Sequence, residues 1–251
     1  MARSIAAAQK VADYAAALEA VLAPDRLAAY RPPGGDELAM ITTYFWNAAL
    51  ARDLHFGLGA VEVSMRNGIH TALSAHAGHA DWYDRVPLLP RERRRVDDAK
   101  DTIRKSGKAV IPGRVVAGVM FDFWTSMLST GFGPNGYGAA IWSPNNAALI
   151  EVAFPNLQPP NDNRSFAHDR FNVLRLLRNR TSHHEPIWQG MTLRDGRTFT
   201  LADLYVDILD AIGWVSLALR DSVVAYDPFP TTLRNGFVEQ EQRIKQHLGI
   251  A

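Results

Sequence analysis

The sequence predicts an all-α protein, a helical bundle with additional helices and one small hairpin insertion. Apolar residues recur every three or four positions through most of the chain, which is the spacing of a helix face. Proline and glycine separate these stretches into segments of helical length, and only residues 192–200 resemble a hairpin. The 251 residues, 47% of them hydrophobic, are enough for one large domain with appendages.

In the first third of the chain, helices are predicted over 5–22, over a short piece at 25–30, from 37 to about 56, and over 58–75. Pro24 ends the first of these helices, and Asp36 is placed as an N-cap. Gly57 and Gly59 weaken the helix there, so a second helix is expected to begin near Leu58. The core face of that helix is expected to consist of Leu58, Val61, Met65, Ile69 and Ala72.

In the middle of the chain, an exposed helix is expected in the first part of 87–114, followed by a loop around Gly107 and Pro112. Helices are expected within 119–130 and within 144–154, with a loop at 131–138 between them. A long helix is expected from Arg164 to Glu185, because Pro186 stops it. Thr200 is placed as the cap of one helix over 201–224, and a tail from Pro228 holds a short helix. The corresponding domain prediction is an N-terminal segment 1–35, a helical domain 36–226 and a tail 227–251.

Composition excludes several classes of site. The chain has no cysteine, which rules out disulfides, thiolate zinc sites and cysteine nucleophiles. Its formal net charge is +1, so any nucleic-acid surface must be local. The first 22 residues lack the continuous apolar core of a signal peptide, and no stretch is apolar enough to span a membrane. We therefore expect a cytoplasmic protein that needs no cofactor.

The segment Arg178-Asn179-Arg180-Thr181-Ser182-His183 is the best candidate for chemistry. On a helix, Asn179 and His183 are i, i+4 neighbours, on a side away from the apolar positions of the segment. An imidazole suits general acid–base work, and a guanidinium binds two phosphate oxygens at once. Arg178 lies roughly 140° from His183 on an ideal helix, so the pair converges only if the last turn is distorted or a second subunit contributes. The alternative is a charged helix end with capping histidines.

Other polar patterns are weaker candidates. Glu62, Arg66 and His70 form a stripe at i, i+4 and i+8, which is also the pattern of a surface ion pair. The glycine-rich stretch at 131–136 fits a dinucleotide-binding loop, but no strand precedes it and Pro134 interrupts the expected helix. Adjacent histidines diverge by about 100° on a helix, so we expect no metal at His183-His184.

Basic residues cluster at 91–114, with Arg93, Arg94 and Arg95 in succession. This cluster is the best local candidate for contact with the backbone of a nucleic acid. The alternative is a solvated helix face, since acidic residues are interleaved with it.

Several stretches together resemble the Abi-like (abortive infection) family of the HEPN superfamily, over roughly residues 20–220. They are LAPDRLAAY (22–30), YFWNAAL (44–50), AVEVSMRNGIHTAL (60–73), WY (82–83) and LLRNRTSHHEPIW (176–188). The last is the most specific, because it carries an Arg, a polar residue and a His at the spacing of the superfamily's motif. The resemblance implies a HEPN-like helical bundle and a homodimer.

The resemblance also implies a metal-independent endoribonuclease of a toxin or phage-defence system, which leaves a 2′,3′-cyclic phosphate. Arg178, Asn179 and His183 would be its catalytic residues, supported by His184, Glu62, Arg66 and Asn67, and an antitoxin or regulator is a possible partner. Because some members are non-catalytic, the alternative is a helical binding or sensor module.

Overall fold

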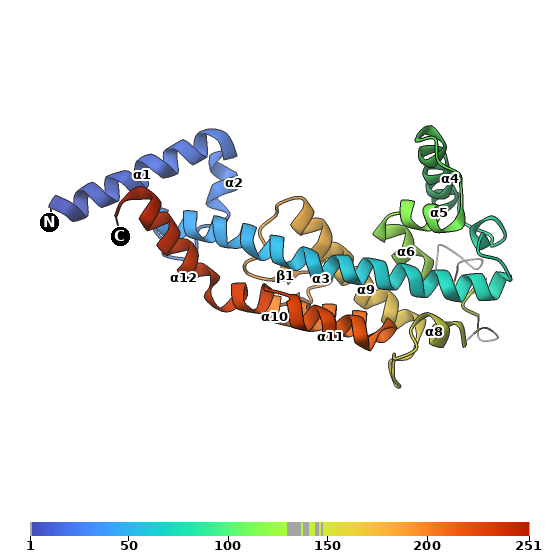
Figure 1. Ribbon diagram of the computed structural model, residues 1–251. Helices are drawn as coiled ribbons and strands as arrows, with labels where there is room; N and C mark the ends of the chain where they lie inside the picture. Colours follow the sequence, from blue (N-terminus) through green and yellow to red (C-terminus); the bar gives the residue numbers. More distant parts are fainter. Residues whose placement is uncertain (1, 130–136, 138–140, 144–145, 147, 251) are drawn as a thin grey trace. The chain divides into compact units, whose positions relative to one another are not determined.

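The computed structural model is mostly helical, which confirms the all-α prediction, and it describes residues 2–129, 137, 141–143, 146 and 148–250 (Figure 1). The predicted loop at 131–138 therefore lies outside the described residues, apart from Tyr137. The helices are α1 (Ala2–Leu22), α2 (Pro24–Ala28), α3 (Glu37–Ala77), the 3₁₀ turn η1 (Trp82–Asp84), α4 (Pro90–Lys105), α5 (Pro112–Gly118), α6 (Phe121–Met127), α8 (Ala148–Ala153), α9 (Arg164–Ser182), α10 (Leu201–Val215), α11 (Leu217–Tyr226) and α12 (Phe229–Leu248). The strands β1 (Met191–Thr192) and β2 (Thr198–Phe199) pair antiparallel, Met191 opposite Phe199, which confirms the predicted hairpin.

The chain folds into two compact units, each made of segments distant in sequence. Unit 1 comprises 1–56, 178–205 and 226–251, and unit 2 comprises 57–177 and 206–225. The three sequence ranges 1–35, 36–226 and 227–251 remain a prediction about domains. No helix among the described residues is long and apolar enough to cross a membrane.

Unit 1 is built around the first half of α3. Its core joins α1, α2, α3 and α12 through buried apolar side chains: Val11, Ala15, Leu27, Met40, Ile41 and Ile244. On α12, Gly236 lies so close to Trp46 that an added Cβ would be 2.8 Å from the indole ring. The indole nitrogen of Trp46 donates to the carbonyl of Thr232 at 3.0 Å, and the Thr232 hydroxyl donates to buried Asp53 at 2.6 Å. These contacts hold α12 on α3.

Unit 2 has an aromatic core. Trp82 of η1 packs on Phe123 and Trp124 of α6, while Phe154 packs on Phe171 of α9. The predicted core face of the 58–75 segment is confirmed, since each of its five apolar residues is at most 1% exposed. Phe171 is fully buried, as are Leu174 and Leu177, which confirms the apolar face of α9.

Apart from the end of α9, four features of the helices differ from the sequence-based expectation. The predicted break at Gly57 and Gly59 is wrong, because α3 continues for 41 residues. Glycine costs only about 1 kcal/mol in a helix, and the burial of Leu54 and Leu58 on either side outweighs it. Pro112 begins helix α5 rather than lying in a loop, since proline is tolerated at a first helical position.

The other two differences are in the C-terminal part. The helix predicted over 201–224 is divided at Ser216, whose hydroxyl accepts the Leu219 amide at 3.2 Å and so starts α11. The tail helix α12 is 20 residues long rather than short. Both predicted N-caps are confirmed: Asp36 accepts the Ala39 amide at 2.8 Å, and Thr200 accepts the Asp203 amide at 3.1 Å.

Candidate functional site

The candidate segment 178–183 lies at the end of α9, and the helix ends three residues earlier than the sequence predicts. It ends at Ser182, and His184 takes a left-handed conformation with φ 54°. The Glu185 amide donates to the carbonyl of Arg180 at 2.9 Å, and the His184 amide donates to Thr181 at 3.3 Å. This pattern is a Schellman ending, in which the left-handed position is normally glycine. The helical hydrogen bonding stays regular up to the His183 amide, which donates to Asn179 at 2.9 Å, so the turn at His184 does not by itself bring Arg178 and His183 together.

The left-handed turn at His184 is fixed by side chains from α2 and the following coil. The carbonyl of His184 accepts one hydrogen bond from the Arg26 guanidinium and one from the Tyr30 hydroxyl, each at 3.1 Å. Burial raises the pKa of Tyr30, so its hydroxyl stays protonated and able to donate. A left-handed non-glycine residue costs roughly 1–3 kcal/mol and persists only where its surroundings impose it.

Asn47 of α3 holds the chain just beyond this turn. Its side-chain oxygen accepts the amide of Ile187 at 2.7 Å and that of Trp188 at 3.1 Å, while its nitrogen donates to the Glu185 carbonyl at 3.4 Å. Asn47 is only 3% exposed. Asn47 therefore positions the segment that follows the motif, whereas the neighbouring Trp46 contacts α12.

A cavity of about 320 Å³ lies beside this turn within unit 1. His184 and Thr181 line it from the end of α9, and Arg52 and His55 line it from α3, together with Tyr30, Tyr44, Asn47, Ala48 and Ala51. Arg52 pairs with Asp53, with 2.6 Å between its Nε and the carboxylate, and this hydrogen bond raises the pKa of Arg52. The cavity therefore combines two imidazoles with a guanidinium.

Sequence reasoning did not select Arg52 or His55. A usable signal was present, because Asn47, Ala51 and His55 are spaced at i, i+4 and i+8 and so share one face of a helix.

The predicted catalytic residues have different surroundings. Arg178 and Asn179 are partly buried, whereas His183 is exposed and is not among the residues that line the cavity. Arg180 pairs with Glu185 at 3.6 Å. Of the two histidines, it is His184 that shares the cavity with His55.

The predicted supporting residues Glu62, Arg66 and Asn67 belong to unit 2, on the second half of α3. Their support of the α9 motif stays a prediction. The Nε of Arg66 is buried with no hydrogen-bond partner among the described residues. In the same stripe, the Nδ1 of His70 accepts the Trp82 indole N–H at 3.0 Å, so His70 has a structural contact, and burial lowers its pKa.

The three consecutive arginines of α4 differ in their partners. Arg93 pairs with Asp84 at 3.2 Å, and Arg95 pairs with Asp122. Arg94 is exposed and makes no ion pair among the described residues. RNA contact by these residues stays a prediction, and Arg94 is the member most available for it.

Comparisons with known proteins add no assignment: no family model matches the chain, and no curated protein or solved structure matches it either. Among the described residues, no three His, Asp or Glu side chains gather as a metal site.

Proposed function

We propose that this chain is a metal-independent endoribonuclease of the toxin or phage-defence class. The observation that carries the proposal is the fixed turn at the end of α9, which follows Arg178-Asn179 and places His184 beside the cavity that also contains His55 and Arg52. Two imidazoles and a guanidinium are what a metal-free phosphodiester cleavage requires. The resemblance of 176–188 to the Abi-like motif supports the same reaction.

The reaction is an internal transfer at phosphorus. One imidazole, His183 or His184, takes the proton of the ribose 2′-hydroxyl, and the 2′-oxygen then bonds to phosphorus. The bond from phosphorus to the 5′-oxygen breaks, and a protonated imidazole donates a proton to the leaving oxygen. Arg178 holds the phosphate as negative charge builds, and Asn179 orients the histidine or the phosphate. The products are a 2′,3′-cyclic phosphate and a 5′-hydroxyl.

The decisive experiment measures cleavage of end-labelled RNA by the purified chain in excess chelator, with identification of the new ends. Cleavage is expected to persist with cyclic phosphate ends. Arg178→Ala and His183→Ala are expected to lower it at least about a hundredfold, the usual contribution of general acid–base catalysis. His184→Ala and His55→Ala separate the cavity histidines from His183.

His76→Ala is the matched control, because His76 is exposed on α3 and carries no contact in the described structure. It is expected to cleave like the unmodified chain. Activity that is lost in chelator and restored by one divalent cation would refute the metal-free mechanism.

A second candidate function is a non-catalytic binding or sensor module. One observation favours it: the two side chains that bind His184 do so through its backbone carbonyl, a contact that serves the turn rather than the imidazole. Induction of the unmodified chain and of His183→Ala in bacteria separates the two functions. Toxicity that disappears with His183→Ala supports the nuclease, whereas equal harmlessness of both supports the module.

A homodimer is part of the nuclease proposal. Arg178 and His183 lie on different sides of the helix end, so two copies of the segment facing one cleft would bring an Arg178 to a His183. A regulator or antitoxin is the kind of partner that a toxic nuclease would require.

A further inference from the structure

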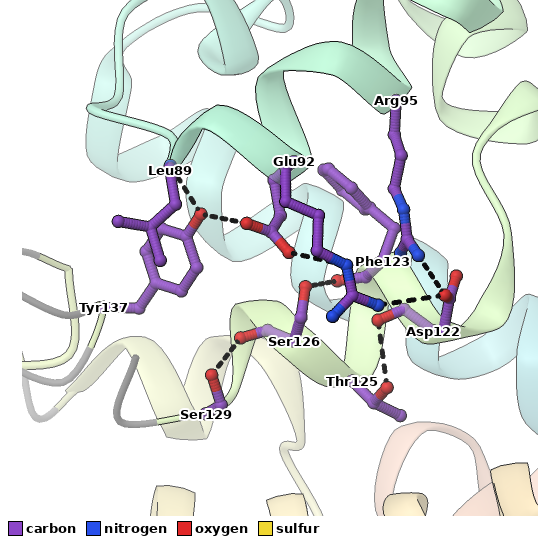
Figure 2. A network of polar contacts seen from close by, with 10 residues as sticks. Leu89, Glu92, Arg95, Asp122, Phe123, Thr125, Ser126, Ser129 and Tyr137 are labelled. Atoms are coloured by element: carbon purple, nitrogen blue, oxygen red, sulfur yellow. Dashed lines mark hydrogen bonds and ion pairs between the residues drawn. The ribbon is translucent and has the colours of Figure 1, made fainter. Parts of the chain in front are cut away.

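A second and larger cavity lies wholly within unit 2, and its lining contains none of the predicted catalytic residues Arg178, Asn179 and His183. Its volume is about 720 Å³, and its walls come from the N-terminal part of α4, from α6 and from residues 168–175 of α9. That volume is within the range of sites for small organic ligands and well above what a single inorganic ion fills. Figure 2 shows the polar network on the α4 and α6 walls, around Glu92 and Asp122.

Three guanidinium groups line this cavity. Arg91 lies between two carboxylates, 4.0 Å from Glu92 and 3.4 Å from Asp122. Arg94 and Arg175 also line it, and neither pairs with a carboxylate among the described residues. With both acids ionised the lining carries a net charge of +1, and the two arginines without carboxylate partners account for its excess positive charge.

Arg175 is held in place without being neutralised. The Asn172 side-chain oxygen accepts two hydrogen bonds from it, at 3.2 Å from Nε and 2.7 Å from Nη2. Burial lowers the pKa of Arg175, Asp122 opposes this effect, and the neighbouring charges of Arg91 and Arg95 lower it further. An anion beside Arg175 would relieve both the desolvation and the repulsion.

The remaining walls offer neutral hydrogen-bonding groups. Hydroxyls of Thr125 and Ser126 line the cavity, and Tyr137 donates to buried Glu92 at 3.2 Å. The Oδ1 of Asp122 is buried without a hydrogen-bond partner in the described structure. Such an acceptor suits a ligand that carries hydroxyl or amino donors as well as an anionic group.

The lining also includes the start of a 16-residue helix. Pro90 occupies its first turn, and the amides of the first turn have no helical acceptor. A helix start favours negative charge, which adds to the guanidinium groups rather than replacing them.

We propose that this cavity binds a small phosphorylated ligand of nucleotide size, with Arg94 and Arg175 contacting its phosphate groups. The hydroxyls of Thr125 and Ser126 already donate to backbone carbonyls of α6, so these hydroxyls and the Asp122 carboxylate would accept hydrogen bonds from the uncharged part. This inference does not depend on the nuclease proposal, because its residues lie in unit 2 and its readout is binding.

Isothermal titration of the full chain tests it with four probes: ADP, GDP, pyrophosphate and adenosine. Pyrophosphate is expected to bind, and so is at least one of the two nucleotides. Adenosine, which has no phosphate, is not expected to bind. Arg94→Gln and Arg175→Gln are each expected to weaken nucleotide binding at least about tenfold, the effect of losing one charge-assisted contact. Arg104→Gln is the matched control, since Arg104 is exposed on the same helix and, among the described residues, its one ion pair is with Asp101.

Arg94→Gln keeps the test valid if Arg175→Gln is poorly folded, because Arg94 is exposed and makes no ion pair in the described structure. The proposal is overturned if none of the phosphorylated probes binds, or if Arg94→Gln binds as tightly as Arg104→Gln. It is also overturned if a short RNA binds through Arg94 while the mononucleotides do not, which would make the cavity part of an RNA surface.

Discussion

Removal of the Asn47 side chain tests whether this residue holds the segment after the motif. Asn47→Ala leaves two backbone amides without their acceptor: that of Ile187, whose side chain is fully buried, and that of Trp188, which is partly buried. A buried unsatisfied donor costs about 1–3 kcal/mol. Alanine has a higher helix propensity than asparagine, which stabilises helix α3 by up to about 0.7 kcal/mol. Two such donors cost about 2–6 kcal/mol, so the expected net loss of unfolding free energy is about 1–6 kcal/mol.

The measurement is urea and thermal unfolding followed by far-UV circular dichroism, with a fall of about 3–24 °C expected in the thermal midpoint. Asn235→Ala is the control, because Asn235 is exposed on α12 of the same unit and has no hydrogen bond in the described structure. It gains the alanine propensity and loses no contact. The role assigned to Asn47 is refuted if the two variants differ by less than about 0.5 kcal/mol.

Three further predictions concern RNA binding, assembly and pH. Three α4 arginines are changed to glutamate: Arg93, Arg94 and Arg95. This change is expected to weaken RNA affinity and to flatten the dependence of that affinity on salt concentration. Unchanged affinity at both low and high salt would mean that these residues form only a solvated helix face. Mixed dimers of Arg178→Ala and His183→Ala are expected to recover partial cleavage, whereas a fully active monomer by light scattering would contradict a composite site. Because burial lowers the pKa of His70, the unfolded chain binds its proton more readily. The contribution of neutral His70 to the free energy of unfolding is therefore expected to be fully present above about pH 6.5. It is expected to be lost as the pH decreases toward the pKa of His70 in the folded chain. His70→Gln should reduce that fall in pH-dependent unfolding, and a fall of the same size would contradict the assignment.

Local signals in the sequence were sufficient for much of the fold. The caps at Asp36 and Thr200 and the hairpin around Gly196 were predictable, because each depends on a few neighbouring residues. The apolar face of the 58–75 segment was predictable as well, since helical spacing alone defines it. The motif segment 178–183 was located by its residue types and spacing, and its place at the end of a helix was foreseen.

Long-range contacts decided the features that sequence reasoning missed. The end of α9 at Ser182 depends on hydrogen bonds to His184 from Arg26 and Tyr30, which are more than 150 positions away. Continuity of α3 through Gly57 depends on burial, which outweighs a local propensity.

The sequence by itself determined which residues could do chemistry, and the tertiary structure decided which of them are neighbours. The basic run at 91–114 was visible as a cluster, but its sequence could not distinguish Arg95, paired with Asp122, from Arg94, which makes no ion pair among the described residues. Nothing in the sequence indicated that Arg175 of α9 lines the same unit 2 cavity as Arg94 of α4. The reason is physical: a carboxylate that already pairs with a guanidinium weakens its attraction for a ligand, and the fold can bring that carboxylate from another segment, as it brings Asp122 to Arg95.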